Sequence, residues 1–276
     1  MNSLLVFNGA VSREAILPLT YQKYLNLPQL LNLQEPRSDG PEQDELLFII
    51  IHQVYELWFK QIIHEVKFIQ NSMDNNHQAD IFHGFKRVLS ILKVLVSQTD
   101  VLETMTPVAF SSFRDRLETS SGFQSVQFRE LEILLGKRDL NLISRFQTND
   151  EEYKLLSELF QKPSLWDSFN QYLKREGYNV PDELIKKDFS KSTQSSSEHQ
   201  QLLIEIYRER SNLMEICERF VDLDEGLQEW RYRHVKMVER TIGIKMGTGG
   251  SSGMEYLKAT VFTPLFPDLW EIRCHL

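Results

Sequence analysis

The feature that most constrains this chain is the spacing of its apolar residues, which recur every three or four positions over long stretches. This spacing places apolar side chains on one face of an α-helix. Strands are not indicated, because no run alternates between apolar and polar residues and no Asn-Gly or Asp-Gly turn joins two β-rich runs. The sequence therefore predicts an all-α fold. The helical stretches cover residues 42–73, 80–102, 124–135 and 198–244.

Glycine and polar runs mark where these helices end. Gly136 directly follows the third stretch, where it suits a helix C-cap. Gly226 lies inside the fourth stretch and predicts one or two helices, broken or kinked near that position. The serine-rich residues 187–201 predict a polar loop. With no internal repeat, we expect a single domain over residues 1–276, built as a helix bundle.

Composition excludes several classes of protein. Lys and Arg total 31 against 39 Asp and Glu, which gives a formal net charge of -8. A nucleic-acid-binding surface needs an excess of basic residues, so no nucleic-acid partner is expected. The two cysteines, Cys217 and Cys274, form no CxxC pair and suit a reducing compartment. We see no signal peptide, and the longest apolar run, residues 46–51, is too short to cross a membrane. A soluble, cytoplasmic protein is the expectation.

Two glycine-containing segments are candidates for ligand contact. Residues 246–253 hold four of the 12 glycines together with Thr248. Their amides could surround an anion, or the segment could be a flexible linker, and composition leaves both interpretations open. Residues 120–123 read Ser-Ser-Gly-Phe and follow Arg114 at short range. That guanidinium could bind a carboxylate, although an arginine paired with an acid on its own helix is the commoner case.

Histidine is the residue type to search for metal or acid-base chemistry. None of the seven histidines belongs to an HExxH or HxxxH pair, which argues against a locally built zinc site. His52 lies in the most apolar stretch, where a lone histidine is usually a core residue. His234 follows Trp-Arg-Tyr-Arg, and one axial histidine with nearby arginines is sufficient to hold haem. A serine hydrolase is not favoured, because no strand precedes a nucleophile motif.

Short blocks spread over most of the chain together carry a more specific signal. They occur from about residue 20 to the Phe-Pro-Asp-Leu-Trp block at 266–270. The other blocks are YQKYL at 21–25, DELLFIIIHQ at 44–53, ELWFK at 56–60, FR at 113–114, SSGFQS at 120–125, WRYRH at 230–234 and GTGGSSG at 247–253. Taken in order, all these blocks resemble the tryptophan 2,3-dioxygenase family.

The resemblance implies an all-helical haem b dioxygenase, a homotetramer built as a dimer of dimers. It would use O2 to cleave the indole C2–C3 bond of L-tryptophan and form N-formyl-L-kynurenine. His234 matches the axial ligand of the haem iron, with Trp230 beside the cofactor. His52 matches the distal histidine that meets the indole N–H, and whether it also acts as a base stays open.

The resemblance also implies the remaining substrate contacts. Arg114 pairs with the substrate carboxylate, and Thr248 lies near its ammonium and carboxylate groups. An N-terminal arm, residues 1–40, packs on a neighbouring subunit and completes that subunit's pocket. The other implied contact residues are Phe48, Phe110, Ser121, Gly122, Tyr21, Tyr24 and Leu25.

Some positions depart from the family pattern. Gln43 stands where the family often has histidine, and Ile51 stands where relatives are often polar. Phe110 is tyrosine in some members. These changes near the pocket leave room for an alternative, a related haem oxygenase acting on a substituted tryptophan or another indole. The presence of both Arg114 and Thr248 argues against an indole without the amino-acid group, which would leave a buried charge unpaired. A non-catalytic haem protein that kept the fold is a third possibility.

Overall fold

A computed structural model describes residues 18–40, 42–147, 149–192, 194–209, 211–243 and 258–276. Within these ranges the chain is mostly helical and contains no strand, so the predicted all-α class is confirmed. The chain divides into two units, Met1–Glu35 and Pro36–Leu276. The single-domain prediction and the N-terminal arm at 1–40 stay predictions.

The N-terminal unit contains two single-turn helices, α1 (Tyr21–Tyr24) and α2 (Leu27–Leu30). The Thr20 hydroxyl accepts from the Lys23 amide and caps α1. Asn26 separates the two helices in the left-handed conformation, φ 54°, which asparagine tolerates better than most residues. No residue of α1 or α2 is buried, so these two helices form no core of their own.

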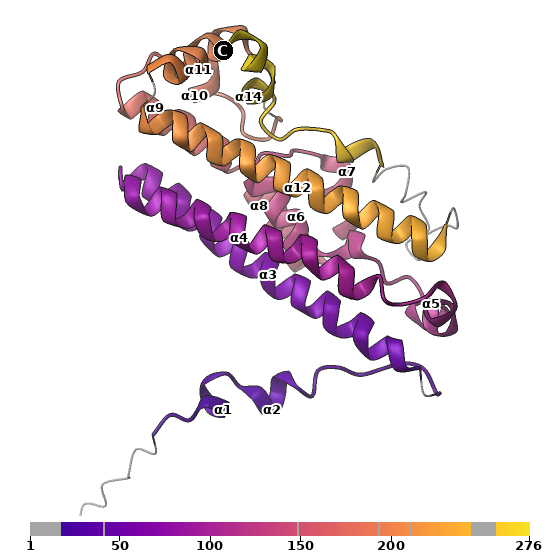
Figure 1. Cartoon of the computed structure of the whole chain (residues 1–276). Coiled ribbons are helices and arrows are strands. Elements are labelled where there is room, and N and C mark those ends of the chain that lie inside the picture. The colour runs from indigo at the N-terminus through magenta and orange to yellow at the C-terminus, as the bar shows by residue number, and fades with distance from the viewer. Residues whose placement is uncertain (1–17, 41, 148, 193, 210, 244–257) are drawn as a thin grey trace, which may run out of the picture. The chain divides into compact units, whose positions relative to one another are not determined.

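Three long helices form the frame of the larger unit: α3 (Gln43–Asp74), α4 (Gln78–Leu102) and α12 (Asn212–Ile242). They lie side by side, with α4 between the other two (Figure 1). The first two match the predicted helical stretches closely. Gly84 allows α3 and α4 to approach, because a Cβ at this position would lie 2.5 Å from the Ile69 side chain.

Shorter helices lie behind this frame and at its two ends, and they complete the core (Figure 1). Gly136 has φ +102° just after α6, which confirms the predicted C-cap. The shorter helices of the described residues are α5 (Pro107–Phe113), η1 (Arg114–Leu117), η2 (Gly122–Gln124), α6 (Val126–Leu134), α7 (Leu140–Ile143), η3 (Ser144–Phe146), α8 (Asp150–Phe160), α9 (Leu165–Arg175), α10 (Asp182–Ile185), α11 (Ser197–Glu209), α14 (Pro267–Glu271) and η4 (Ile272–His275).

Two predicted boundaries were wrong. The fourth helical stretch does not break at Gly226, which lies inside the continuous helix α12; α11 instead ends at Glu209 and α12 begins at Asn212. Gly226 serves packing, since a Cβ there would lie 3.2 Å from Leu92 on α4. The polar loop predicted at 187–201 is shorter, because Ser197 already begins α11.

By length and composition alone, α3 is apolar enough to cross a membrane. In the structure it packs against α4, α6 and α9, and Ile62, Val66 and Ile69 lie in the core. Helix packing therefore accounts for the apolar side chains of its C-terminal half. Its N-terminal half faces a large cavity.

Candidate functional site

A large cavity opens between α3, α6, α12 and the segment that follows α5. Its volume is about 270 Å³. Pockets for drug-sized ligands measure roughly 300–1,000 Å³, so this cavity lies close to the lower end of that range. Eight residues predicted from the sequence line it and are brought together by the fold: Phe48, His52, Phe110, Arg114, Ser121, Gly122, Trp230 and His234.

Helical spacing explains why the cavity walls have this composition. On α3 the lining residues are Phe48, His52, Tyr55, Glu56 and Phe59, separated by steps of four, three, one and three. Such steps keep side chains on one helix face. The α12 wall follows the same rule at residues 230, 231, 234, 237 and 238. Two helix faces therefore build most of the site.

His52 has a defined tautomer. Its Nδ1 lies 2.7 Å from the carbonyl oxygen of Phe48, one turn earlier on α3. A carbonyl only accepts, so Nδ1 carries the proton and donates it, which leaves Nε2 of the neutral ring as an acceptor. Burial within the protein lowers the pKa of His52, and this effect outweighs the opposing Phe48 hydrogen bond and the Glu56 charge. The ring can therefore accept a hydrogen bond from a ligand N–H.

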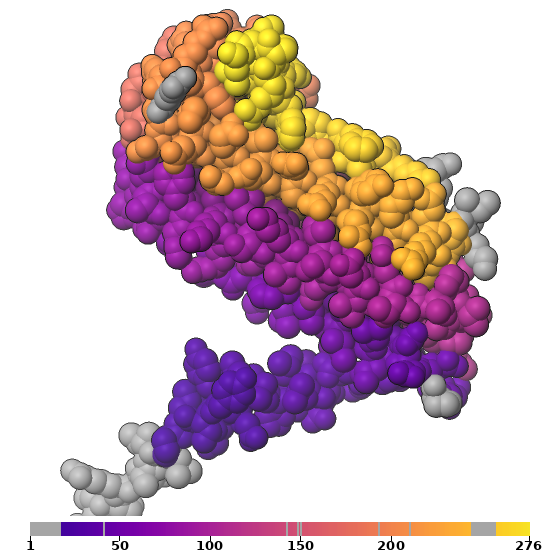
Figure 2. Space-filling model, in the orientation of Figure 1, coloured from indigo at the N-terminus to yellow at the C-terminus, as the bar shows by residue number. Residues whose placement is uncertain are grey.

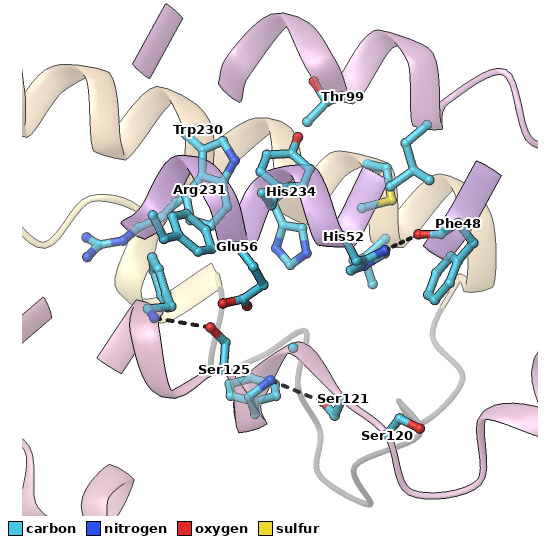
Figure 3. Close-up of a pocket in the computed structure, with 18 of the residues that line it drawn as sticks. Phe48, His52, Glu56, Thr99, Ser120, Ser121, Ser125, Trp230, Arg231 and His234 are labelled. Atoms are coloured by element: carbon cyan, nitrogen blue, oxygen red, sulfur yellow. Dashed lines mark hydrogen bonds between the residues drawn. The ribbon is translucent and has the colours of Figure 1, made fainter. Parts of the chain in front are cut away.

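His234 projects into the same cavity from α12 (Figure 3). The Trp230 ring, one turn earlier, stacks on its imidazole with 5.8 Å between centroids and 13° between planes. Among the described residues, none hydrogen-bonds to this imidazole. Burial, with a smaller effect from His52, lowers the pKa of His234 to about 4. At neutral pH the ring is thus uncharged, which is the form that coordinates a metal.

An aromatic wall closes one end of the cavity. Phe48 lies 5.7 Å from both Phe110 and Phe113, measured between ring centroids, and these two lie 5.4 Å apart nearly edge to face. Phe48 also contacts the His52 ring at 4.1 Å. Offset and edge-to-face arrangements of this kind suit the insertion of a further flat ring. The wall therefore fits an aromatic ligand beside His52.

Polar groups line the cavity next to that wall. Arg114 begins the η1 turn directly after α5, and its side chain is part of the lining. Ser121 caps the η2 turn through a capping box with Gln124, which holds residues 120–124 in place. A Cβ on Gly122 would meet nothing within 4 Å, so this glycine faces open space. Arg114 offers a guanidinium for a carboxylate close to the aromatic wall.

A second group of charges, absent from the prediction, forms another part of the lining. Glu132 forms ion pairs with Arg129, with Lys137 at 2.8 Å and with Arg231 at 3.6 Å. Both arginines and Glu132 are buried, with 6–7 % of each side chain exposed. We call these four residues the cation cluster. Within the cluster three cations share the Glu132 carboxylate, and Nε of Arg129 is buried without a partner among the described residues.

Several predicted positions are not part of the described cavity. Thr248 and the glycine-rich segment around it lie outside the described residues. Tyr21, Tyr24 and Leu25 belong to the N-terminal unit, where their side chains are exposed. Their role in the pocket of a neighbouring subunit stays a prediction.

Sequence reasoning also missed part of the wall. Tyr55, Phe59 and Glu56 could have been found by extending the Phe48–His52 spacing along α3, and Arg231 by its position one turn before His234. No sequence signal marked Phe128 or Arg129, which reach the cavity from α6. Within the described part of the chain, no cluster of three His, Cys, Asp or Glu side chains is arranged to hold a metal ion.

The fold and the cavity define an all-helical protein with a large ligand site between two histidine-bearing helices. The family model described as tryptophan 2,3-dioxygenase matches residues 8–201 and 179–276. A protein named tryptophan 2,3-dioxygenase from Herpetosiphon aurantiacus is 53 % identical over 258 residues, covering 94 % of this chain and 98 % of the relative. The chain belongs to the tryptophan 2,3-dioxygenase family, which confirms the resemblance.

More distant relatives show the same coverage. A tryptophan 2,3-dioxygenase from Anaeromyxobacter dehalogenans is 51 % identical over 256 residues, covering 92 % of this chain and 95 % of the relative. One from Caulobacter vibrioides is 42 % identical over 261 residues, covering 94 % and 98 %. The similarity extends over nearly the full length of each protein, so it includes both histidine-bearing helices.

Proposed function

We propose that this protein is a haem-dependent dioxygenase that cleaves the indole C2–C3 bond of L-tryptophan with O2 and releases N-formyl-L-kynurenine. The observation that carries this proposal is the convergence of His234, His52, Arg114 and the Phe48 wall in one cavity. Membership of the family supports it. The alternative of another indole substrate is not favoured, because the relatives are named for tryptophan.

The residues of the cavity fit haem b. His234 is neutral and stacks on Trp230, and its imidazole would hold the haem iron. The cation cluster has more positive than negative charge and a buried unpaired donor on Arg129, which suits the carboxylates of such a cofactor. Bound haem iron would supply the binding and activation of O2.

The contribution of the protein is to bind and orient the substrate. His52 Nε2 would accept the indole N–H, because Nδ1 is engaged with the Phe48 carbonyl. The Phe48 wall would hold the ring, and Arg114 would pair with the carboxylate. Three contacts at separate points fix one orientation of the C2–C3 bond.

We further infer a cytoplasmic homotetramer, a dimer of dimers in which the N-terminal unit packs on a neighbouring subunit. Exposed apolar side chains support assembly. Leu46, Ile50 and Leu57 are exposed on α3, and Tyr21 and Tyr24 are exposed in the N-terminal unit. Contiguous exposed apolar surface is uncommon on monomers and is typical of subunit contacts.

The proposal is tested by turnover of the reduced, haem-loaded protein in air, followed by the near-ultraviolet absorbance of N-formylkynurenine. We expect product from L-tryptophan and little from indole. His234→Ala should abolish the haem spectrum. Normal haem binding by that variant would overturn the ligand assignment. A normal haem spectrum without product from tryptophan would overturn the proposed function.

Tryptamine, which lacks the carboxylate, isolates the role of Arg114. We expect Arg114→Ala to raise KM for tryptophan by roughly tenfold or more, the loss of a charge-assisted pair. The same substitution should leave the poorer KM for tryptamine nearly unchanged, because there is no carboxylate to lose. Equal effects on both substrates would mean that Arg114 acts on the fold and not on the carboxylate.

A further inference from the structure

The C-terminal part of the larger unit runs back along α12. We call residues 258–266 the strap. At one end Lys258 Nζ lies 3.1 Å from Glu239 Oε1 on α12. At the other end the amides of Leu265 and Phe266 donate to Asp224 Oδ2, at 2.8 and 3.2 Å. Figure 2 shows the C-terminal residues, in yellow, lying against α12, in orange. The strap is thus attached to α12 at both ends.

The bonds to Asp224 are the stronger attachment. The Lys258–Glu239 pair is exposed, and exposed ion pairs contribute little to stability. Asp224 is fully buried, and its Oδ2 also accepts from the Trp270 indole N–H at 3.0 Å. Its Oδ1 accepts from Gln228 at 3.1 Å. Among the described residues no cation pairs with Asp224, so four neutral donors satisfy its charge.

The strap matters to the cavity because Thr260 is part of the cavity lining and Val261 next to it is buried. Both lie between the two points of attachment. On α12, His234 also lies between the two anchoring residues, ten positions after Asp224 and five before Glu239. The anchors therefore set the position of the Thr260 wall relative to the helix that carries His234.

The side chain of Phe266 fixes the position of the strap along α12. This side chain is fully buried and packs on Trp166 and Phe220, with ring centroids 5.2 and 4.9 Å away. A slip of one residue along the strap would remove the Phe266 ring from that site. It would also leave the Leu265 and Phe266 amides without their carboxylate, and an unpaired buried amide is costly.

We propose that Asp224 is a positioning residue, which holds the strap and thereby the Thr260 wall of the tryptophan site without touching the substrate. The proposal rests on the proposed function for its kinetic consequence. Its structural part, the attachment of the strap by the Asp224 carboxylate, is independent of turnover and is measured separately.

Hydrogen exchange tests the attachment in the full-length, haem-loaded protein. In Asp224→Ala we expect the amides of Leu265 and Phe266 to exchange at least tenfold faster, the factor that corresponds to losing a charged acceptor. Asp222→Asn is the matched control, because Asp222 is a partly exposed acid on the same helix paired with Arg219. In Asp222→Asn the amides of Leu265 and Phe266 should exchange at the same rate as in the unmodified protein. Unchanged exchange in Asp224→Ala would overturn the proposal.

Kinetics tests the consequence. Asp224→Ala should raise KM for tryptophan about tenfold and leave kcat within about threefold, since His52 and Arg114 keep their contacts. Faster exchange with an unchanged KM would refute the positioning role. If Asp224→Ala fails to fold, Asp224→Asn, which keeps the volume of the side chain and removes the charge of the acceptor, should give smaller changes in the same directions. An unmodified protein without turnover would refute the proposed function, while the exchange result would still judge the attachment.

Discussion

The cation cluster yields a prediction that separates cofactor binding from general stability. Replacing Glu132 with glutamine keeps the volume of the side chain and removes the carboxylate that pairs with Arg129, Lys137 and Arg231. Without cofactor, the two buried arginines then lose the carboxylate that pairs with them. Leaving buried charges uncompensated in this way costs about 3–5 kcal/mol.

The expected loss of stability is large because most of the cation cluster is buried. Glu132 and Arg231 are each about 7 % exposed, and only Lys137, at 22 %, reaches solvent appreciably. For a chain of this size, 1 kcal/mol corresponds to about 2–4 °C in Tm, so unliganded Glu132→Gln should melt about 6–20 °C below the unmodified protein. With haem bound, its carboxylates replace the lost charge, and the difference should shrink by at least half.

Thermal unfolding of the unliganded and haem-loaded proteins provides the assay. Glu130→Gln is the control, because Glu130 is the neighbour of Glu132 on α6 but pairs with Lys67, which is half exposed. That pair should contribute little, about 0–1 kcal/mol. Equal losses of Tm with and without haem would refute the idea that the cluster receives the carboxylates of the cofactor.

Three further predictions follow from the site and the fold. Because burial lowers the pKa of His52 from 6.5 and the acceptor is the neutral ring, the fall of kcat/KM for tryptophan in acid should be centred below pH 6.5; a decline centred above pH 7 would contradict this. Phe48→Ala should raise KM for tryptophan roughly tenfold by removing the ring wall, and an unchanged KM measured in steady-state assays would exclude that contact. Gly226→Val should lower the free energy of unfolding by about 1–3 kcal/mol because its Cβ meets Leu92, whereas Gly122→Ala, which faces open space, should change it by less than about 0.5 kcal/mol in denaturant titrations.

The frame of the fold was predictable because apolar spacing reports directly which helix face is buried. The α3 and α4 helices came within a few residues of the predicted bounds. The prediction at Gly226 was wrong because a glycine in a helical stretch can mark either a break in the helix or the close approach of another helix. The sequence shows Gly226, but it does not show that Leu92 of α4 packs against it.

The candidate site was predictable only in part, for a related reason. Resemblance to the family supplied His52, Arg114 and His234, and the structure brings all three to one cavity. The sequence did not predict the cation cluster, because the spacing of Arg129 and Glu132 on α6 is that of an ordinary (i, i+3) ion pair on a helix surface. In the folded chain α6 packs against α3 and α8, and Arg231 of α12 reaches Glu132; a single sequence does not report these contacts.

We expect this protein to insert both atoms of O2 into L-tryptophan bound in the cavity between α3 and α12. Mass spectrometry of the product formed by the reduced, haem-loaded protein under oxygen-18 gas tests this directly. The product should be N-formylkynurenine carrying two oxygen-18 atoms, and His234→Ala should form none. A product with a single labelled oxygen would instead show a monooxygenase.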